Sequence, residues 1–323
     1  MLSNALVNVR APLASGKSNS KPLPRGVSTP VEQPRRWTRV AAPSCVAHDA
    51  RGWFLEAVLE HRAPVGSVGW AMVIDLNGDL GESYGRWRVT DEAALVPSLT
   101  SVNLACGFHA GDPSALRAAI RLAATHRVAI GAHPSYPDLR GFGRVPMALP
   151  PYQIRDDVLY QLGALQALCH AEGEPLRHVK PHGALYHAVC EDPATAEAVA
   201  EAIAAFDAGL PVMVRAGSRA EDVMEEAGLR VLPEAFLDRA YLPDGGLVPR
   251  HRPGALLDDV DEIAERAVRL ACDGLVTAVD GSTLRLAPAT LCLHGDGVSS
   301  VGVARRVRDA LAAAGVRLQP ASA

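Results

Sequence analysis

From residue 72 onward, short apolar runs alternate with longer amphipathic stretches. The apolar runs are predicted strands and cover residues 72–77, 100–105, 128–133, 177–182, 211–215, 230–236 and 289–295. The amphipathic stretches are predicted helices over residues 114–127, 153–173, 195–206, 218–228 and 258–274. This alternation indicates parallel strands joined by right-handed crossovers. Seven units predict an α/β fold, a β/α barrel of about seven parallel strands, with an open doubly wound sheet as the alternative.

Two of the predicted helices have well-marked starts. Asp112 precedes Pro113, and Asp192 precedes Pro193. A carboxylate that can accept from free backbone N–H groups, followed by proline at the first helical position, is typical of a helix N-terminus. We therefore interpret Asp112 as a cap, and we interpret Cys106 as a small buried thiol.

Residues 1–71 differ from the rest of the chain in composition. They are rich in Pro, Ser and Arg and show little hydrophobic periodicity. Such a segment cannot bury enough apolar surface to fold. We expect either a disordered extension or a misannotated start, with translation beginning at Met72. Residues 72–323 are then expected to form a single catalytic barrel domain.

Composition excludes several classes of partner. Residues 1–71 carry a net charge of +5 and residues 72–323 one of −9, which together give the −4 of the whole chain. An acidic domain without a clustered basic face argues against a nucleic-acid partner. No apolar run reaches the roughly 18–20 residues of a membrane helix. The six cysteines form no CxxC pair, which argues against disulfides and thiolate zinc sites and favours a cytoplasmic location.

Polar residues follow the predicted strands, and the carboxyl ends of parallel strands meet at one end of a barrel. The first such segment supplies Asp75, Asn77, Asp79 and Glu82. We expect Asp75 and Asn77 to share one face of the strand, with Asp79 and Glu82 on the turn beyond it. Carboxylates gathered in this way suit a divalent cation or acid–base catalysis, although Asp79 alone could simply form an Asx turn.

Four histidines each end or follow a predicted strand: His109, His133, His182 and His294. Their common placement predicts one shared site. Imidazoles there could shuttle protons, or could bind a metal together with a carboxylate, and Asp75, His109 and His133 are the candidate ligands. The spacing matches no HExxH helix, so a zinc protease is not indicated.

Lys180 is the only lysine after residue 21, although the chain contains 32 Lys and Arg residues. It lies at the predicted carboxyl end of a strand, beside His182. A compact ammonium there can balance the charge of an oxyanion or a phosphate. The chain has no P-loop, no GxGxxG and no GxSxG motif, so any nucleotide would be bound unconventionally or by another subunit.

Several long motifs are similar to those of a known family. They are IDLNGDLGESYG, SVNLACGFHAGDP, IGAHPSYPDLRGFGR, KPHGALY, EAFLDRAY with DGGLVPR, and LHGD. In this order they resemble the LamB/YcsF family. The resemblance covers residues 72–320 and implies a barrel related to the glycoside hydrolase and deacetylase barrels. It also implies the role of A subunit in ATP-dependent 5-oxoprolinase, acting with B and C subunits to convert 5-oxoproline (pyroglutamate), ATP and water to glutamate, ADP and phosphate.

The sequence departs from the family pattern at Val145, at Ala235 and Leu237, and after the HGD motif. These departures bear on substrate detail more than on reaction class. The motifs retain Arg144, Glu234, Asp238, Arg239, His294 and Asp296. With Asn77, Asp79 and Glu82, all of these except Asp238 are our candidate substrate-binding residues.

The hypothesis from sequence is that partner subunits use ATP to phosphorylate the lactam oxygen and that this chain opens the ring. Asp75 or His109 would activate water, while His133 and His182 would shuttle protons or bind a metal. Arg144 or Arg239 would hold the substrate carboxylate, and Lys180 would balance the phosphate charge. Two alternatives remain: a metal-dependent amidohydrolase or deacetylase without ATP, and a noncatalytic regulatory subunit that binds a small acid.

Overall fold

The structure is a computed structural model that describes residues 72–294 and 300–322. The prediction of disorder for residues 1–71 and the candidate residue Asp296 both lie outside the described residues.

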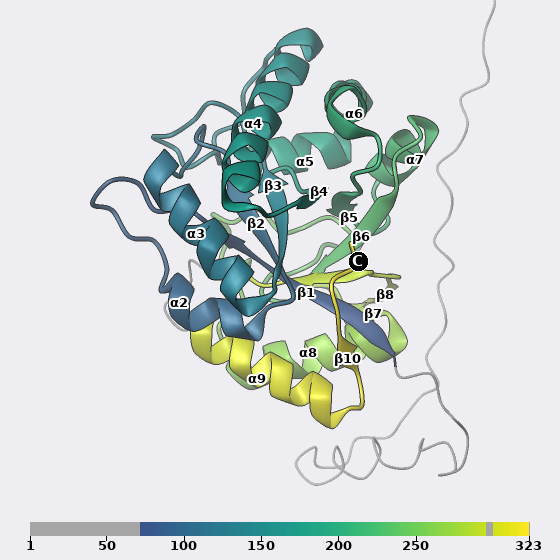
Figure 1. Ribbon diagram of the computed structural model, residues 1–323. Coiled ribbons are helices and arrows are strands. Elements are labelled where there is room, and N and C mark those ends of the chain that lie inside the picture. Colours follow the sequence, from purple (N-terminus) through teal and green to yellow (C-terminus); the bar gives the residue numbers. More distant parts are fainter. Residues whose placement is uncertain (1–71, 295–299, 323) are drawn as a thin grey trace, which may run out of the picture. The chain divides into compact units, whose positions relative to one another are not determined.

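Seven parallel strands close into a barrel, as predicted (Figure 1). They are β1 (Val73–Leu80), β2 (Ser101–Ala105), β3 (Ala129–His133), β4 (Leu176–Val179), β5 (Val212–Arg215), β6 (Val231–Phe236) and β9 (Thr290–Cys292). Each strand pairs with the next, and β9 pairs with both β6 and β1. Because the ring is closed, the open doubly wound sheet is excluded.

Helices surround the strands in Figure 1. The predicted helices are α3 (Pro113–His126), α4 (Pro151–Glu172), α6 (Pro193–Asp207), α7 (Arg219–Glu226) and α8 (Val260–Asp273). Asp112 caps α3 by accepting from the backbone N–H of Ser114 and Ala115, and Asp192 caps α6 by accepting from that of Thr195. Both predicted helix starts are therefore confirmed.

Several elements were not among the predicted ones. They are α2 (Glu92–Leu95) with the short 3₁₀ helix η1 (Val96–Ser98), α5 (Gly183–Glu191), α9 (Ser300–Ala313), the antiparallel hairpin of β7 (Leu275–Thr277) and β8 (Thr283–Arg285), and β10 (Arg317–Leu318). The last strand pairs in parallel with the start of β1, so the end of the chain extends the sheet beside the first strand.

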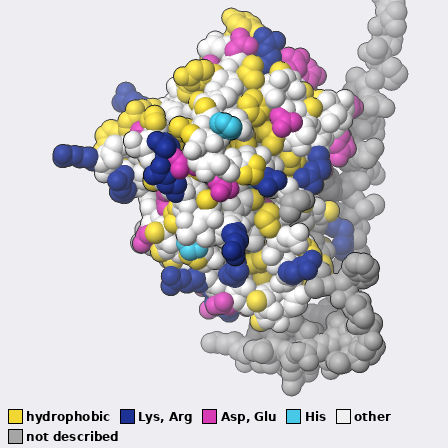
Figure 2. Space-filling view, in the orientation of Figure 1, with side chains coloured by type: hydrophobic (Ala, Val, Ile, Leu, Met, Phe, Trp, Pro, Cys, Tyr) yellow, Lys and Arg dark blue, Asp and Glu magenta, His cyan; other side chains and the backbone are white. Residues whose placement is uncertain are grey.

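Charged side chains are spread over the visible surface. On the face shown in Figure 2, Lys and Arg side chains are scattered and interspersed with Asp and Glu, without a continuous basic area. Within the described ranges, no helix is both long and apolar enough to cross a membrane.

The interior of the barrel contains polar side chains. Asp75 and Asn77 are fully buried, and Asp79 is nearly so. All three side chains project from one face of β1, since side chains alternate along a strand. Asp79 lies inside the strand, which continues to Leu80, so its expected place on a turn was wrong. The extra strand length places the Asp79 carboxylate near the carboxyl end of the barrel.

Candidate active site

A cavity of about 330 Å³ lies among residues at the carboxyl ends of the strands. This is at the lower end of the range for small-molecule sites. Its polar lining includes Asp79, His133, Lys180, His182 and His294. The structure therefore brings together residues more than 200 positions apart in the sequence, as the barrel arrangement predicted.

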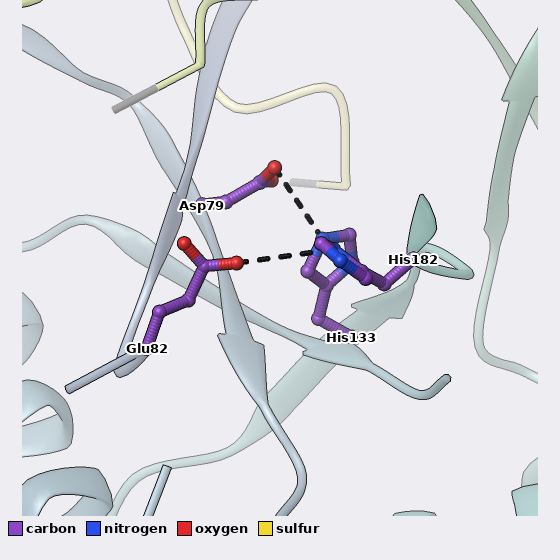
Figure 3. Close-up of side chains that lie close together, drawn as sticks. All are labelled: Asp79, Glu82, His133 and His182. Atoms are coloured by element: carbon purple, nitrogen blue, oxygen red, sulfur yellow. Dashed lines mark hydrogen bonds and ion pairs between the residues drawn. The ribbon is translucent and has the colours of Figure 1, made fainter. Parts of the chain in front are cut away.

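Asp79, Glu82, His133 and His182 form a compact group of possible metal ligands among the described residues. One ligand atom from each lies within 4.8 Å of the others. Figure 3 shows the two carboxylates pointing toward the two imidazoles. Asp79 Oδ2 is 3.4 Å from His133 Nε2, and Glu82 Oε1 is 3.8 Å from His182 Nδ1. Such a buried Asp/Glu/His cluster could hold a divalent metal.

Backbone carbonyls set the proton positions on both imidazoles. His133 Nδ1 lies 2.6 Å from the carbonyl oxygen of Lys180, and His182 Nε2 lies 2.9 Å from that of Phe142. A carbonyl only accepts, so both ring nitrogens must carry hydrogen. The two remaining nitrogens, His133 Nε2 and His182 Nδ1, face one another at 2.9 Å. With both rings neutral, two lone pairs would meet there, so the geometry calls for a proton or a cation at that point.

His109 lies behind this group and is fully buried. Its ring stacks on that of His182 with centroids 3.9 Å apart, and its Nε2 is 3.5 Å from Glu82 Oε1. Burial, followed by the charge of His133, lowers the pKa of His109 well below its usual value. His109 is not among the residues lining the cavity, so it packs against Glu82 and His182 from behind rather than facing a ligand.

Lys180 is buried and its ammonium is surrounded by acceptors. Its Nζ lies 2.8 Å from Glu234 Oε1, 3.3 Å from Asp79 Oδ1 and 3.1 Å from Asn77 Oδ1. It also lies 3.1 Å from Cys292 Sγ. Burial opposes the charged form, but Asp79 and Glu234 raise the pKa of Lys180 well above its usual value. The ammonium therefore stays protonated and holds the two carboxylates in place.

Asp75 occupies the opposite end of the barrel interior. Its carboxylate accepts from the hydroxyls of Thr100 at 2.6 Å, Ser101 at 2.8 Å and Thr290 at 2.6 Å. Four residues along a strand separate it from Asp79 by roughly 13 Å. Burial raises the pKa of Asp75. The structure thus separates Asp75 from His133 and His109, with which it was expected to share a metal, and Asp79 and Glu82 stand in its place.

The model of the LamB/YcsF family matches residues 74–323. The chain belongs to the LamB/YcsF family. Two similar relatives are each named as the A subunit of 5-oxoprolinase. One, from Thermus thermophilus, is 52% identical over 77% of this chain and 99% of that protein, and the other, from Pyrococcus furiosus, is 48% identical over 77% of this chain and 98% of that protein.

A solved structure is also similar to this LamB/YcsF chain. It is the crystal structure of a lactam utilization protein from Thermus thermophilus, with a TM-score of 0.73 and 50% sequence identity. The match covers 77% of this chain and 99% of that one. Together with the closed ring of strands, it supports the barrel predicted from the sequence.

The LamB/YcsF motifs place the remaining candidates around the cavity. Arg144 and Arg239 line it directly. His294 Nδ1 lies 3.0 Å from both carboxylate oxygens of Asp238, which orients its ring. Glu234 and Asn77 do not line the cavity, and both contact Lys180, which does.

Four polar lining residues were not among the candidates from the sequence: Tyr186, His187, Arg250 and His251. Arg250 and His251 belong to the long segment after β6, where neither hydrophobic periodicity nor strand ends mark a position. The DGGLVPR motif, which ends at Arg250, was the one signal in the sequence that could have identified that residue.

Proposed function

We propose that this chain is the A subunit of an ATP-dependent 5-oxoprolinase and opens the lactam ring of 5-oxoproline to give L-glutamate. The observation that carries the proposal is identity of about 50% over nearly the full length of relatives that bear this name. The B and C subunits are the proposed partners. Because the chain lacks a P-loop, ATP is assigned to those partners. A cytoplasmic location remains a prediction.

The chemistry of the cavity supports ring opening. Hydrolysis of a lactam needs a group that takes a proton from water, a group that returns one to the ring nitrogen, and positive charge where the carbonyl oxygen becomes negative. His133 Nε2 faces the site with its proton position fixed by the Lys180 carbonyl, so it is assigned as the proton acceptor. His182, on the adjacent loop, is assigned as the group that returns the proton.

With a divalent metal bound, Asp79, Glu82, His133 and His182 are its proposed ligands, and His133 Nε2 and His182 Nδ1 would then coordinate the ion instead of transferring protons. These residues fit a metal because His133 Nε2 and His182 Nδ1 lie 2.9 Å apart, with no hydrogen of their own between them. The other nitrogen of each ring is bound to a backbone carbonyl, and the carboxylates of Asp79 and Glu82 lie beside the pair. A bound divalent ion would supply Lewis-acid polarisation of a carbonyl oxygen. Mixed imidazole and carboxylate donors suit a first-row transition metal.

Lys180 is assigned a positioning role in place of direct contact with a phosphate. Its ammonium lies within 3.3 Å of the carboxylates of Asp79 and Glu234 and of the Asn77 amide oxygen. It therefore keeps Asp79 ionised and oriented toward His133. The pKa shifts of the two groups are consistent with this role. The pKa of Asp79 is held well below its usual value despite burial, and that of Lys180 is raised well above its usual value.

A second candidate is an ATP-independent, metal-dependent amide hydrolase. The compact cluster of two carboxylates and two histidines is the observation that favours it. The two candidates differ in their need for ATP and for partner subunits, so one assay separates them.

The test is glutamate release from 5-oxoproline by the full chain, alone and with the B and C subunits, with and without ATP. Glutamate only in the complete mixture supports the proposal. Glutamate from the isolated chain without ATP supports the second candidate. Absence of glutamate in all mixtures, with all chains folded, contradicts both. Asp79→Asn should abolish the activity, whereas Asp309→Asn, on the exposed side of α9, should not change it.

A further inference from the structure

Glu82 differs from Asp79 and His133 in where its backbone lies. Asp79 belongs to β1 and His133 ends β3, so hydrogen bonds of the barrel hold both. Glu82 lies beyond the end of β1, in the irregular segment of residues 81–91 that leads to α2. Figure 3 shows its side chain projecting from this segment toward His182. Contacts other than the barrel ladder must therefore fix the Glu82 carboxylate.

The segment packs incompletely against the two helices that follow it in the chain. A hollow of about 680 Å³ is lined both by the segment, including Ser83, Tyr84 and Gly85, and by the first turns of α2 and α3. Glu92 of α2 and Asp112, the cap of α3, line the same hollow. Where apolar contacts are few, the hydrogen bonds of a loop decide how well it is fixed.

Two carboxylates hold the segment, one on each side of Glu82. Glu92 Oε1 accepts from the backbone N–H of Gly81 at 2.9 Å, and Asp112 Oδ2 accepts from that of Gly85 at 2.8 Å. The acceptors lie 11 and 27 positions later in the chain than their donors, outside the segment. Hydrogen bonds to an ionised group are stronger than those between neutral groups. Glu92 and Asp112, the clamp residues, therefore fix the backbone directly before Glu82 and three residues after it.

Asp112 has two tasks and uses a different oxygen for each. Its Oδ1 accepts from two backbone N–H groups in the first turn of α3, at 2.9 and 3.1 Å, which is the predicted helix cap. Its Oδ2 accepts from Gly85. The corresponding Asp192 before α6 bonds to the N–H and hydroxyl of Thr195, inside its own helix, at 3.1 and 2.6 Å. The contact of Asp112 with Gly85 is therefore not a requirement of a helix start.

The turn after β1 also lies against the residue that precedes Asp112. A Cβ on Gly111 would come within 2.6 Å of the carbonyl oxygen of Gly81, so glycine is needed for this close approach. Gly81 itself has a φ of 69°, in the left-handed region that favours glycine. The close approach brings the turn and the start of α3 together on the side where Asp112 bonds to Gly85.

We infer that the clamp residues position Glu82, holding its segment so that its carboxylate reaches the other proposed metal ligands. The inference rests on the proposed function and deepens its metal site. Neither clamp residue lines the cavity of about 330 Å³, so neither touches the substrate. Without the clamps, Glu82 would reach an ion only after its segment had been ordered, and that entropy cost would weaken binding. Replacing a residue that orients a metal ligand typically lowers metal affinity by about 10- to 100-fold.

Binding of Co²⁺ measures this effect without the reaction, since the mixed imidazole and carboxylate donors suit such an ion. The full chain, freed of metal by chelation, is titrated with Co²⁺; calorimetry gives the dissociation constant, and visible absorption reports the ligand set. Glu92→Ala removes the acceptor of the Gly81 N–H, so it should weaken Co²⁺ binding by about 10- to 100-fold and change the absorption. Glu92→Gln keeps an oxygen for the same N–H and should restore the affinity to within about threefold.

Asp112 offers a matched test. Asp112→Asn keeps one oxygen for the helix cap but places an amide N–H group opposite the N–H of Gly85, so two donors meet. Asn and Asp cap helices equally well. Because this contact is exposed to solvent, we expect a smaller loss of Co²⁺ affinity, about three- to tenfold. The control Asp192→Asn makes the same replacement before α6 and should leave the affinity unchanged. Thermal unfolding checks that each variant is folded.

Unchanged Co²⁺ affinity in Glu92→Ala and Asp112→Asn, with both folded, would overturn the inference and leave the proposed ligands in place. Equal weakening by Asp112→Asn and Asp192→Asn would also overturn it, because the effect would then come from helix capping. Absence of Co²⁺ binding by the unchanged chain would overturn the inference together with the proposed metal site. Glutamate release by the complete mixture of subunits shows separately whether the proposed function stands.

Discussion

Replacing Lys180 by methionine tests whether its ammonium holds the interior of the barrel together. Methionine keeps most of the length of the side chain and removes the charge. The carboxylates of Glu234 and Asp79, 2.8 and 3.3 Å from Nζ, would then lose their closest cation in a buried environment. Removing one partner of a buried pair costs about 3–5 kcal/mol, because the other charge stays buried. We therefore expect Lys180→Met to lower the free energy of unfolding by about that amount as well as to abolish activity.

Urea unfolding measures this loss at neutral pH. Arg305→Met, on the exposed face of α9, is the matched control and should change the unfolding free energy by less than about 0.5 kcal/mol. Adding Glu234→Gln to Lys180→Met should restore about 1–3 kcal/mol, since it removes one of the uncompensated charges. If Lys180→Met unfolded within about 0.5 kcal/mol of the unchanged protein, the positioning role would be refuted.

The same contacts predict how the stability of the protein depends on pH. The pKa of Asp79 lies well below 3.8 in the folded protein, so its contribution to stability is complete above pH 3.8 and is lost as the pH falls through the folded pKa. The pKa of Lys180 lies well above 10.5, so its contribution is complete below pH 10.5 and is lost at higher pH. The stability difference between the protein and Lys180→Met should be largest between these limits and should narrow below pH 3.8, as measured by unfolding from about pH 2 to 8.

Two further predictions concern the metal and the packing of the barrel. After its metal is removed by chelation and a divalent ion is added back and dialysed, the full chain should bind one ion per molecule by elemental analysis. His133→Ala should bind none, whereas the exposed His126→Asn should still bind one. Equal binding by the two variants would contradict the proposed ligands. Gly131→Ala should lower the free energy of unfolding by about 1–3 kcal/mol, because its Cβ would overlap the His178 ring. The control Gly163→Ala, in open space on α4, should raise the free energy of unfolding by about 0.5–1 kcal/mol. No loss of stability for Gly131→Ala would show that the His178 ring can move aside.

The sequence predicted the barrel because its strands are buried and therefore appear as apolar runs. All seven barrel strands lie within or close to those runs. The strand β10 and the β7–β8 hairpin were missed, since strands of two or three residues contain too few positions for a period to appear. The helix α9, which follows a Gly- and Ser-rich stretch, was also missed; it lacks the Asp-Pro start seen at α3 and α6, but so do α4, α7 and α8, which were predicted.

The candidate site was predicted only in part from the sequence. Alternation along β1 correctly placed Asp75 and Asn77 on one face, but it does not tell how far along the barrel axis each side chain lies. Asp75 lies near the amino end of the barrel, bound to three hydroxyls, and Asp79 lies near the carboxyl end, beside His133. The acceptors around the Lys180 ammonium come from strands far apart in the chain. These contacts therefore could not be predicted from the residues next to Lys180 in the sequence.

The closure of the ring has a consequence for how this protein is made. The Asp75 carboxylate accepts from Thr290, which is 215 positions later in the chain, and β1 pairs with β9 and β10 as well as with β2. During synthesis, one edge of β1 therefore stays unpaired until almost the whole chain has left the ribosome. Contacts of such long sequence separation form late and slow folding. We expect nascent chains to depend on chaperones that cover this exposed edge until the last strands arrive.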